Sequence, residues 1–67
     1  MYLTIRGKLI CISEIREAYV EIWNNGSQIV ISYKGVQGYS TITYGKREEC
    51  IKDYELLCNA CIAIKGV

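Results

Sequence analysis

Two consecutive hairpins can be read from this chain, and together they constrain its fold more than any other feature. Asn25-Gly26 lies between two runs of alternating apolar residues and favours a type I′ turn, whose two central residues both need φ > 0. A second connection, over Gly35 to Gly38, continues the same strand. The predicted pairs are Trp23 with Gln28, Ile22 with Ile29, Val20 with Ile31, Ala18 with Tyr33, Tyr33 with Ser40, Ile31 with Ile42 and Ile29 with Tyr44. Both hairpins place the same residues on the same face, which predicts one antiparallel meander.

An earlier hairpin is expected from two short β-rich runs joined by Gly7-Lys8, where a glycine in first position suits a type II′ turn. Ser13 to Glu17 is polar enough to form a connector with a short turn. A helix over Ser13 to Trp23 is the alternative, but the β-branched and aromatic residues there favour a strand. The five predicted strands are 2–6, 9–13, 18–24, 28–34 and 39–44.

Residues 46–64 show the periodicity of an amphipathic helix. Apolar residues recur on one arc at 100° per residue, and charged residues occupy most of the opposite side. The expected apolar arc contains Ile51, Tyr54, Leu57, Cys58, Cys61 and Ile62. Cys50 shares this arc.

The expected architecture is a single α+β domain over residues 1–67, in which the helix covers one face of a sheet of about five strands. Alternation assigns the apolar residues to that covered face. Its predicted members are Leu3, Ile5, Ile10, Ile12, Ala18, Val20, Ile22, Ile29, Ile31, Tyr33, Ile42 and Tyr44.

The opposite face carries aromatics and small hydroxyls with little charge, which is typical of the centre of a protein interface. It would also hold Leu9 and Cys11 if the first hairpin joined the same sheet. The alternative is an ordinary sheet surface whose cross-strand pairs stabilise strands without binding anything. The candidate interface residues are Tyr19, Trp23, Val30, Lys34, Tyr39 and Thr41.

Lys46 and Arg47 lie at the expected start of the helix, where free N–H groups and two cations could hold an anion. A solvated charged turn beside Glu48 and Glu49 is the alternative. These cations, together with tyrosines that could stack on a base, also allow a small-ligand or nucleotide-sequestering protein.

Composition limits the chemistry. The chain of 67 residues has no histidine, so no catalytic motif is expected. A nucleic-acid-binding module is a further alternative, but the formal net charge of +1 disfavours it because such modules carry a basic surface. We expect its four cysteines to act as small apolar side chains, with no metal and no cofactor. Without a secretory signal in the sequence, the expected location is cytoplasmic.

In its order of elements the chain resembles very small proteins encoded by bacteria and their phages. The resemblance lies in a short first strand with a Gly-Lys turn, a three-strand meander, and a closing helix that begins Lys-Arg-Glu-Glu-Cys-Ile-Lys-Asp-Tyr-Glu at Lys46. It implies stoichiometric inhibition of host or defence proteins, as anti-CRISPR proteins do, or sequestration of small nucleotide signals. It assigns no functional residue.

The sequence therefore predicts a non-enzymatic small binding protein. We expect it to form a homodimer and to act by stoichiometric protein–protein interaction, with another protein as partner and no membrane association.

Overall fold

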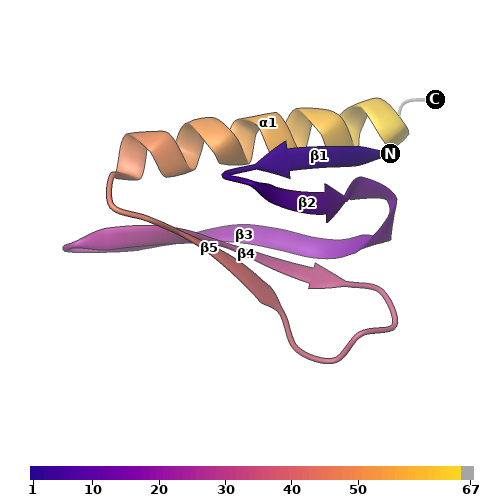
Figure 1. Ribbon diagram of the computed structural model, residues 1–67, viewed down its shortest axis with the longest axis horizontal. Helices are drawn as coiled ribbons and strands as arrows, with labels where there is room; N and C mark the ends of the chain where they lie inside the picture. The colour runs from indigo at the N-terminus through magenta and orange to yellow at the C-terminus, as the bar shows by residue number, and fades with distance from the viewer. Residues whose placement is uncertain (66–67) are drawn as a thin grey trace.

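Five antiparallel strands, one short 3₁₀ turn and one long helix make up the protein (Figure 1). The computed structural model describes residues 1–65, with side chains described as far as residue 62. The elements are β1 (Tyr2–Ile5), β2 (Lys8–Cys11), η1 (Ile12–Glu14), β3 (Ile15–Trp23), β4 (Gly26–Tyr33), β5 (Ser40–Tyr44) and α1 (Arg47–Lys65). The predicted α+β fold is confirmed, and the chain from Ile15 to Trp23 is a strand and not a helix.

The strands form two sheets: β1 pairs with β2, and β3, β4 and β5 form a three-stranded sheet in that order. The turn η1 redirects the chain between β2 and β3, so the first hairpin does not extend the larger sheet. Instead, the hairpin and α1 lie on the same side of that sheet (Figure 1). Leu9 and Cys11 are therefore not part of its opposite face.

The pairing register of each hairpin differs from the predicted register by two residues. Ile5 pairs with Lys8, Trp23 with Gly26, and Ile29 with Ile42. The first loop is Arg6-Gly7, with φ of 50° and 78°, so its turn has the type I′ signature and not the predicted type II′. The second loop is Asn24-Asn25, and neither residue has a positive φ.

The third connection spans residues 34–39 and has positive φ at Gly35 and Gly38. In β3, a register shift between Ile15 and Glu17 leaves Arg16 unpaired, and Tyr33 pairs with Ile15. The predicted partners of Tyr33, Ala18 and Ser40, both pair with Ile31 because of the two-residue difference in register.

A slip of two residues keeps every side chain on its original face, and the predicted core is largely confirmed. The buried apolar residues are Ile5, Ile10, Ile12, Ile29, Ile31, Ile42, Tyr44, Cys50 and Leu57, and Leu3, Ile15, Ala18, Val20, Tyr33, Tyr54, Ala60 and Cys61 pack against them.

Three residues predicted to be in the core are exposed. Ile22 is 49% exposed because β3 ends beside the Asn24-Asn25 turn, which projects past the start of α1 (Figure 1). Ile51 and Ile62 are exposed because the stripe of the helix that faces the sheet runs through Cys50, Tyr54, Leu57 and Cys61.

The outer edge of β5 is occupied by two cations from the first hairpin. Residues 40, 42 and 44 bond to β4, so the backbone groups of Thr41 and Thr43 point away from the sheet. Lys8 Nζ donates to the Thr41 carbonyl at 3.0 Å, and Arg6 Nη1 donates to the Thr43 carbonyl at 3.3 Å. Charged side chains of this kind keep a further strand from pairing with an edge.

Candidate functional site

The face of the three-stranded sheet opposite to α1 is covered by no element within residues 1–65 (Figure 1). Alternation from the observed pairs gives its members as Glu17, Tyr19, Glu21, Trp23, Gly26, Gln28, Val30, Ser32, Thr41 and Thr43. We call this set the open face. It is the surface on which the sequence predicted an interface.

The centre of the open face is a cross-strand row of Tyr19, Val30 and Thr41, one residue from each strand. All three are predicted site residues. Val30 is only 1% exposed, so a partner could not contact it directly. Tyr19 is 44% exposed and is available to a partner. In the next row, Gln28 Nε2 donates to Glu21 Oε1 at 2.6 Å, which fixes a polar border.

Trp23 pairs with Gly26 at the end of the open face, and its ring passes close to that glycine. A Cβ at Gly26 would lie 3.9 Å from the Trp23 Cε3 atom and 3.4 Å from the Tyr44 carbonyl oxygen. Both are ordinary contact distances, so neither packing nor backbone conformation requires a glycine at this position, and the predicted type I′ turn at Asn25-Gly26 is wrong. Trp23 is 49% exposed.

Lys34 and Tyr39 lie in the connection between β4 and β5, so they do not pair with each other. The Lys34 ammonium donates to the Ser13 carbonyl at 3.4 Å, and its backbone N–H donates to the Glu14 carbonyl. Lys34 is thereby turned toward η1 and away from the open face. Tyr39 directly precedes β5 and is 70% exposed.

Lys46 and Arg47 lie beside Trp23, in a hollow of about 440 Å³ between the β3–β4 turn and the start of α1. The sequence singled out the two cations and the indole separately, and the fold brings them together. Glu48 also lines the hollow and places one carboxylate among these groups. An indole with two cations is suited to a planar anion.

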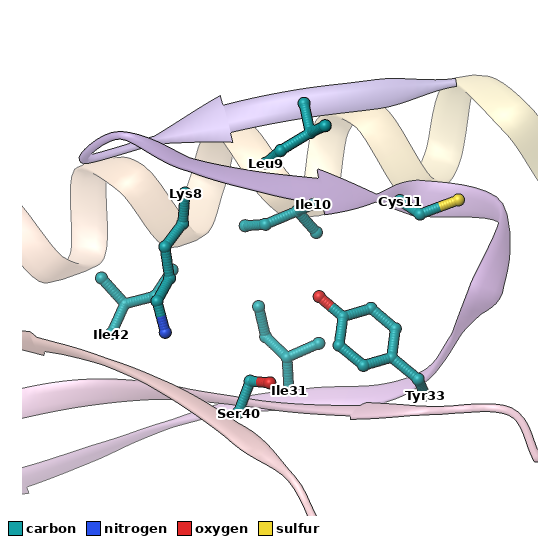
Figure 2. A pocket seen from close by; sticks show the side chains of 8 residues that line it. All are labelled: Lys8, Leu9, Ile10, Cys11, Ile31, Tyr33, Ser40 and Ile42. Atoms are coloured by element: carbon teal, nitrogen blue, oxygen red, sulfur yellow. The ribbon is translucent and has the colours of Figure 1, made fainter. Parts of the chain in front are cut away.

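A second hollow, of about 390 Å³, lies between β2 and the larger sheet (Figure 2). Ile10 faces Ile31 and Tyr33 across it, and Lys8 closes one end (Figure 2). Burial, followed by the nearby Cys11, raises the pKa of Tyr33, so its hydroxyl stays protonated. The sequence missed this hollow because it placed the first hairpin beside the sheet and not over it.

The four cysteines are free thiols: Cys50 is buried, and Cys11, Cys58 and Cys61 are half-buried. Within residues 1–65, no three His, Cys, Asp or Glu side chains lie close enough together to hold a metal ion. No helix in the same part of the chain is long and apolar enough to cross a membrane.

Comparison with known proteins finds no family model, no curated protein and no solved structure that matches this chain.

Proposed function

We propose that the protein is a non-enzymatic binding protein that acts by stoichiometric contact with another protein through the open face. The observation that supports this is the uncovered sheet face (Figure 1), which carries exposed Tyr19 and Trp23, with exposed Tyr39 directly preceding β5. Aromatic residues with few charges characterise interface centres, because they bury a large apolar area with little loss of side-chain entropy.

The proposed partner is a host or defence protein that this chain inhibits. The resemblance to small phage proteins supports this assignment. The absence of histidine from the chain removes the commonest general base, which supports the non-enzymatic part of the proposal. Self-association is a second part of the proposal, because a chain of 67 residues gains stability from burying further surface against a copy of itself.

The test is affinity capture from a bacterial lysate with matched variants. Tyr19→Ala and Tyr39→Ala alter the open face and its border, and Leu56→Ala is the control because Leu56 is 51% exposed on α1. A partner captured in a fixed ratio by the wild type and by Leu56→Ala, and lost with both tyrosine variants, is the expected result. A partner that both tyrosine variants retain contradicts the proposal.

A nucleotide-sequestering function is the second candidate, and it is favoured by the hollow that joins Trp23 to Lys46 and Arg47. Trp23 is the only tryptophan in the chain, so its fluorescence reports directly on this site. Quenching by nucleotides that is lost in a Lys46→Ala/Arg47→Ala variant would support this function. An unchanged Trp23 emission would exclude it.

A further inference from the structure

The two edges of the larger sheet differ in what covers them. Arg6 and Lys8 occupy the β5 edge. On β3, the odd-numbered residues bond to β4, because Trp23 pairs with Gly26 across a two-residue loop. The backbone groups of Val20 and Ile22 therefore point outward, and within residues 1–65 they have no hydrogen-bond partner. Such an edge is a template for another strand.

An apolar groove of about 390 Å³ runs beside the first half of β3, on the side of the sheet that α1 covers. Ala18, Tyr54, Leu57 and Cys58 are among the residues that line it. Ile22 lies on this same side of the sheet, and half of its side chain is exposed where β3 projects past the helix. One molecule thus carries both an apolar groove and an exposed apolar side chain, at opposite ends of one strand.

The length of β3 limits the registers in which a second copy can pair with its free edge. A symmetric antiparallel pair centred on Ala18 or an earlier residue would place Ile22 opposite a residue outside β3, and one centred on Ile22 or beyond would pair at most residues 21–23 of the strand. The centres that place Ile22 opposite a different residue of β3 are Tyr19, Val20 and Glu21.

The charges on β3 then select one of these registers. A centre at Tyr19 places Glu17 opposite Glu21, and a centre at Glu21 places that residue opposite itself. Like charges directly opposite each other are destabilising. A centre at Val20 instead places Glu21 opposite Tyr19 and Glu17 opposite Trp23, so no two carboxylates face each other.

We propose that two copies of this chain pair antiparallel along β3, centred on Val20, and that Ile22 of each copy enters the groove beside Ala18 of the other. Val20 bonds to Val20 of the second copy, and Ala18 bonds to Ile22 in both directions. The Ala18 carbonyl, which already accepts from the Tyr54 hydroxyl at 3.2 Å, has a second lone pair for this bond. The six strands, three from each copy, form one continuous sheet with a doubled open face.

This inference rests on the self-association in the proposed function, and it assigns the contact to a sheet edge and not to the open face. Each surface can therefore be tested without the other. Ile22→Lys should abolish the dimer and leave partner capture by the monomer possible. Tyr39→Ala should abolish partner capture and leave the dimer intact.

The first experiment measures subunit number by native mass spectrometry and sedimentation for the wild type, Val20→Pro and Ile22→Lys. Proline at Val20 removes an N–H that the single chain does not use. Thr43→Pro is the matched control, because its N–H lies on the β5 edge. We expect a wild-type dimer that Thr43→Pro retains, and a dissociation constant raised about 100-fold or more in the two β3 variants. Far-UV circular dichroism confirms that each variant is folded.

A monomeric wild type at high concentration overturns the inference, and so does a dimer that survives Ile22→Lys. Ile22→Lys keeps the test decisive if Val20→Pro does not fold, because Ile22 is exposed and makes no core contact.

The register is tested by disulfide formation with oxidised glutathione. Val20→Cys should link two copies, because directly opposed residues of a bonded antiparallel pair have Cα atoms about 5.5 Å apart. Ile22→Cys should not link, because the two copies of Ile22 lie four residues out of register. Trypsin releases residues 17–34 as a peptide without a native cysteine, so a linked peptide identifies the new bond. Linkage through Ile22→Cys and not Val20→Cys contradicts the Val20 centre.

Discussion

The guanidinium of Arg6 lies 4.3 Å from the ring centre of Tyr44, and this contact joins the tip of the first hairpin to the last strand of the sheet. Arg6 Nη2 also pairs with Glu49 Oε2 at 2.8 Å, which adds the first turn of α1 to the same junction. The side chain is held there although Arg6 has a φ of 50°, the only positive φ outside glycine within residues 1–65. One residue thus links hairpin, sheet and helix while it adopts a strained backbone.

Two substitutions at Arg6 can separate the stability gained from its side-chain contacts from the cost of its left-handed backbone. Arg6→Ala should lower the free energy of unfolding by about 1–2 kcal/mol, because it removes the cation–π contact and a half-exposed ion pair but keeps the left-handed backbone. Arg6→Gly should lower it by about 1 kcal/mol less, because glycine adopts this φ without strain. Urea unfolding measures both, with the exposed Arg16→Ala as control. Equal losses in the two Arg6 variants would show that the backbone is unstrained.

The buried Tyr44 should make stability fall at alkaline pH. Burial, then the hydrogen bond to Asp53 Oδ2 at 2.8 Å and the charge of Asp53, raise the pKa of Tyr44 above its ordinary value of 10.0. Above that pH the unfolded chain loses the phenol proton while the folded protein keeps it, so stability falls by up to about 1.4 kcal/mol per pH unit. Tyr33 contributes with the same sign.

The variant Tyr44→Phe isolates this contribution. It should lose about 1–3 kcal/mol at neutral pH with the hydrogen bond to Asp53, and its stability should decline less steeply between about pH 9 and pH 11. Urea unfolding of the wild type and of Tyr44→Phe across this range gives both slopes. Parallel slopes would contradict the raised pKa.

Two glycines, Gly7 in the first hairpin turn and Gly26 at the start of β4, should respond differently to alanine. Gly7 has a φ of 78°, so Gly7→Ala should cost about 1 kcal/mol. Gly26 has no positive φ, and a Cβ there would make ordinary contacts with Trp23 and the Tyr44 carbonyl. Gly26→Ala should therefore change stability by less than about 0.5 kcal/mol. Thermal unfolding of the two variants compares them directly, and a larger loss at Gly26 would favour the type I′ turn at Asn25-Gly26.

Ser27 offers a stabilising substitution. Its side chain is fully buried on β4, and its hydroxyl has no hydrogen-bond partner within the described part of the chain. Removal of an unsatisfied buried hydroxyl is neutral or favourable, so Ser27→Ala should raise the free energy of unfolding by up to about 1 kcal/mol. Ser32→Ala, on the other face of the same strand, is the comparison in a urea titration. A loss above about 1 kcal/mol for Ser27→Ala would mean that the hydroxyl is hydrogen-bonded.

Alternation was sufficient to predict the faces of the sheet, but turn composition was not sufficient to predict the register. The apolar residues of β3, β4 and β5 keep a period of two. If the pairing register shifts by an even number of residues, Ile29, Ile31 and Ile42 therefore still face the core. Gly7 can occupy either central position of a two-residue turn, and Asn24-Asn25-Gly26 contains two acceptable loops. Side-chain packing between the strands decides which of these two-residue loops forms. A short stretch of sequence around the turn does not specify that packing.

The candidate site was predicted where strands are regular and missed where they end. Tyr19, Val30 and Thr41 lie in one row as their alternation required. Lys34 left the open face because β4 stops at Tyr33, after which the period of two no longer applies. The hollow in Figure 2 depends on how one sheet rests on another, which is a tertiary relationship that neither hairpin encodes alone.

The cations along β5 also determine how far strand pairing can extend. A sheet with two bare edges can add copies at both sides and grow into a fibre, as amyloid-forming chains do. Here Arg6 and Lys8 occupy the β5 edge, so the assembly that we propose along β3 would close at two copies, with no bare edge left for further growth. The contacts that hold the first hairpin on the sheet would thus also set the upper limit of assembly size.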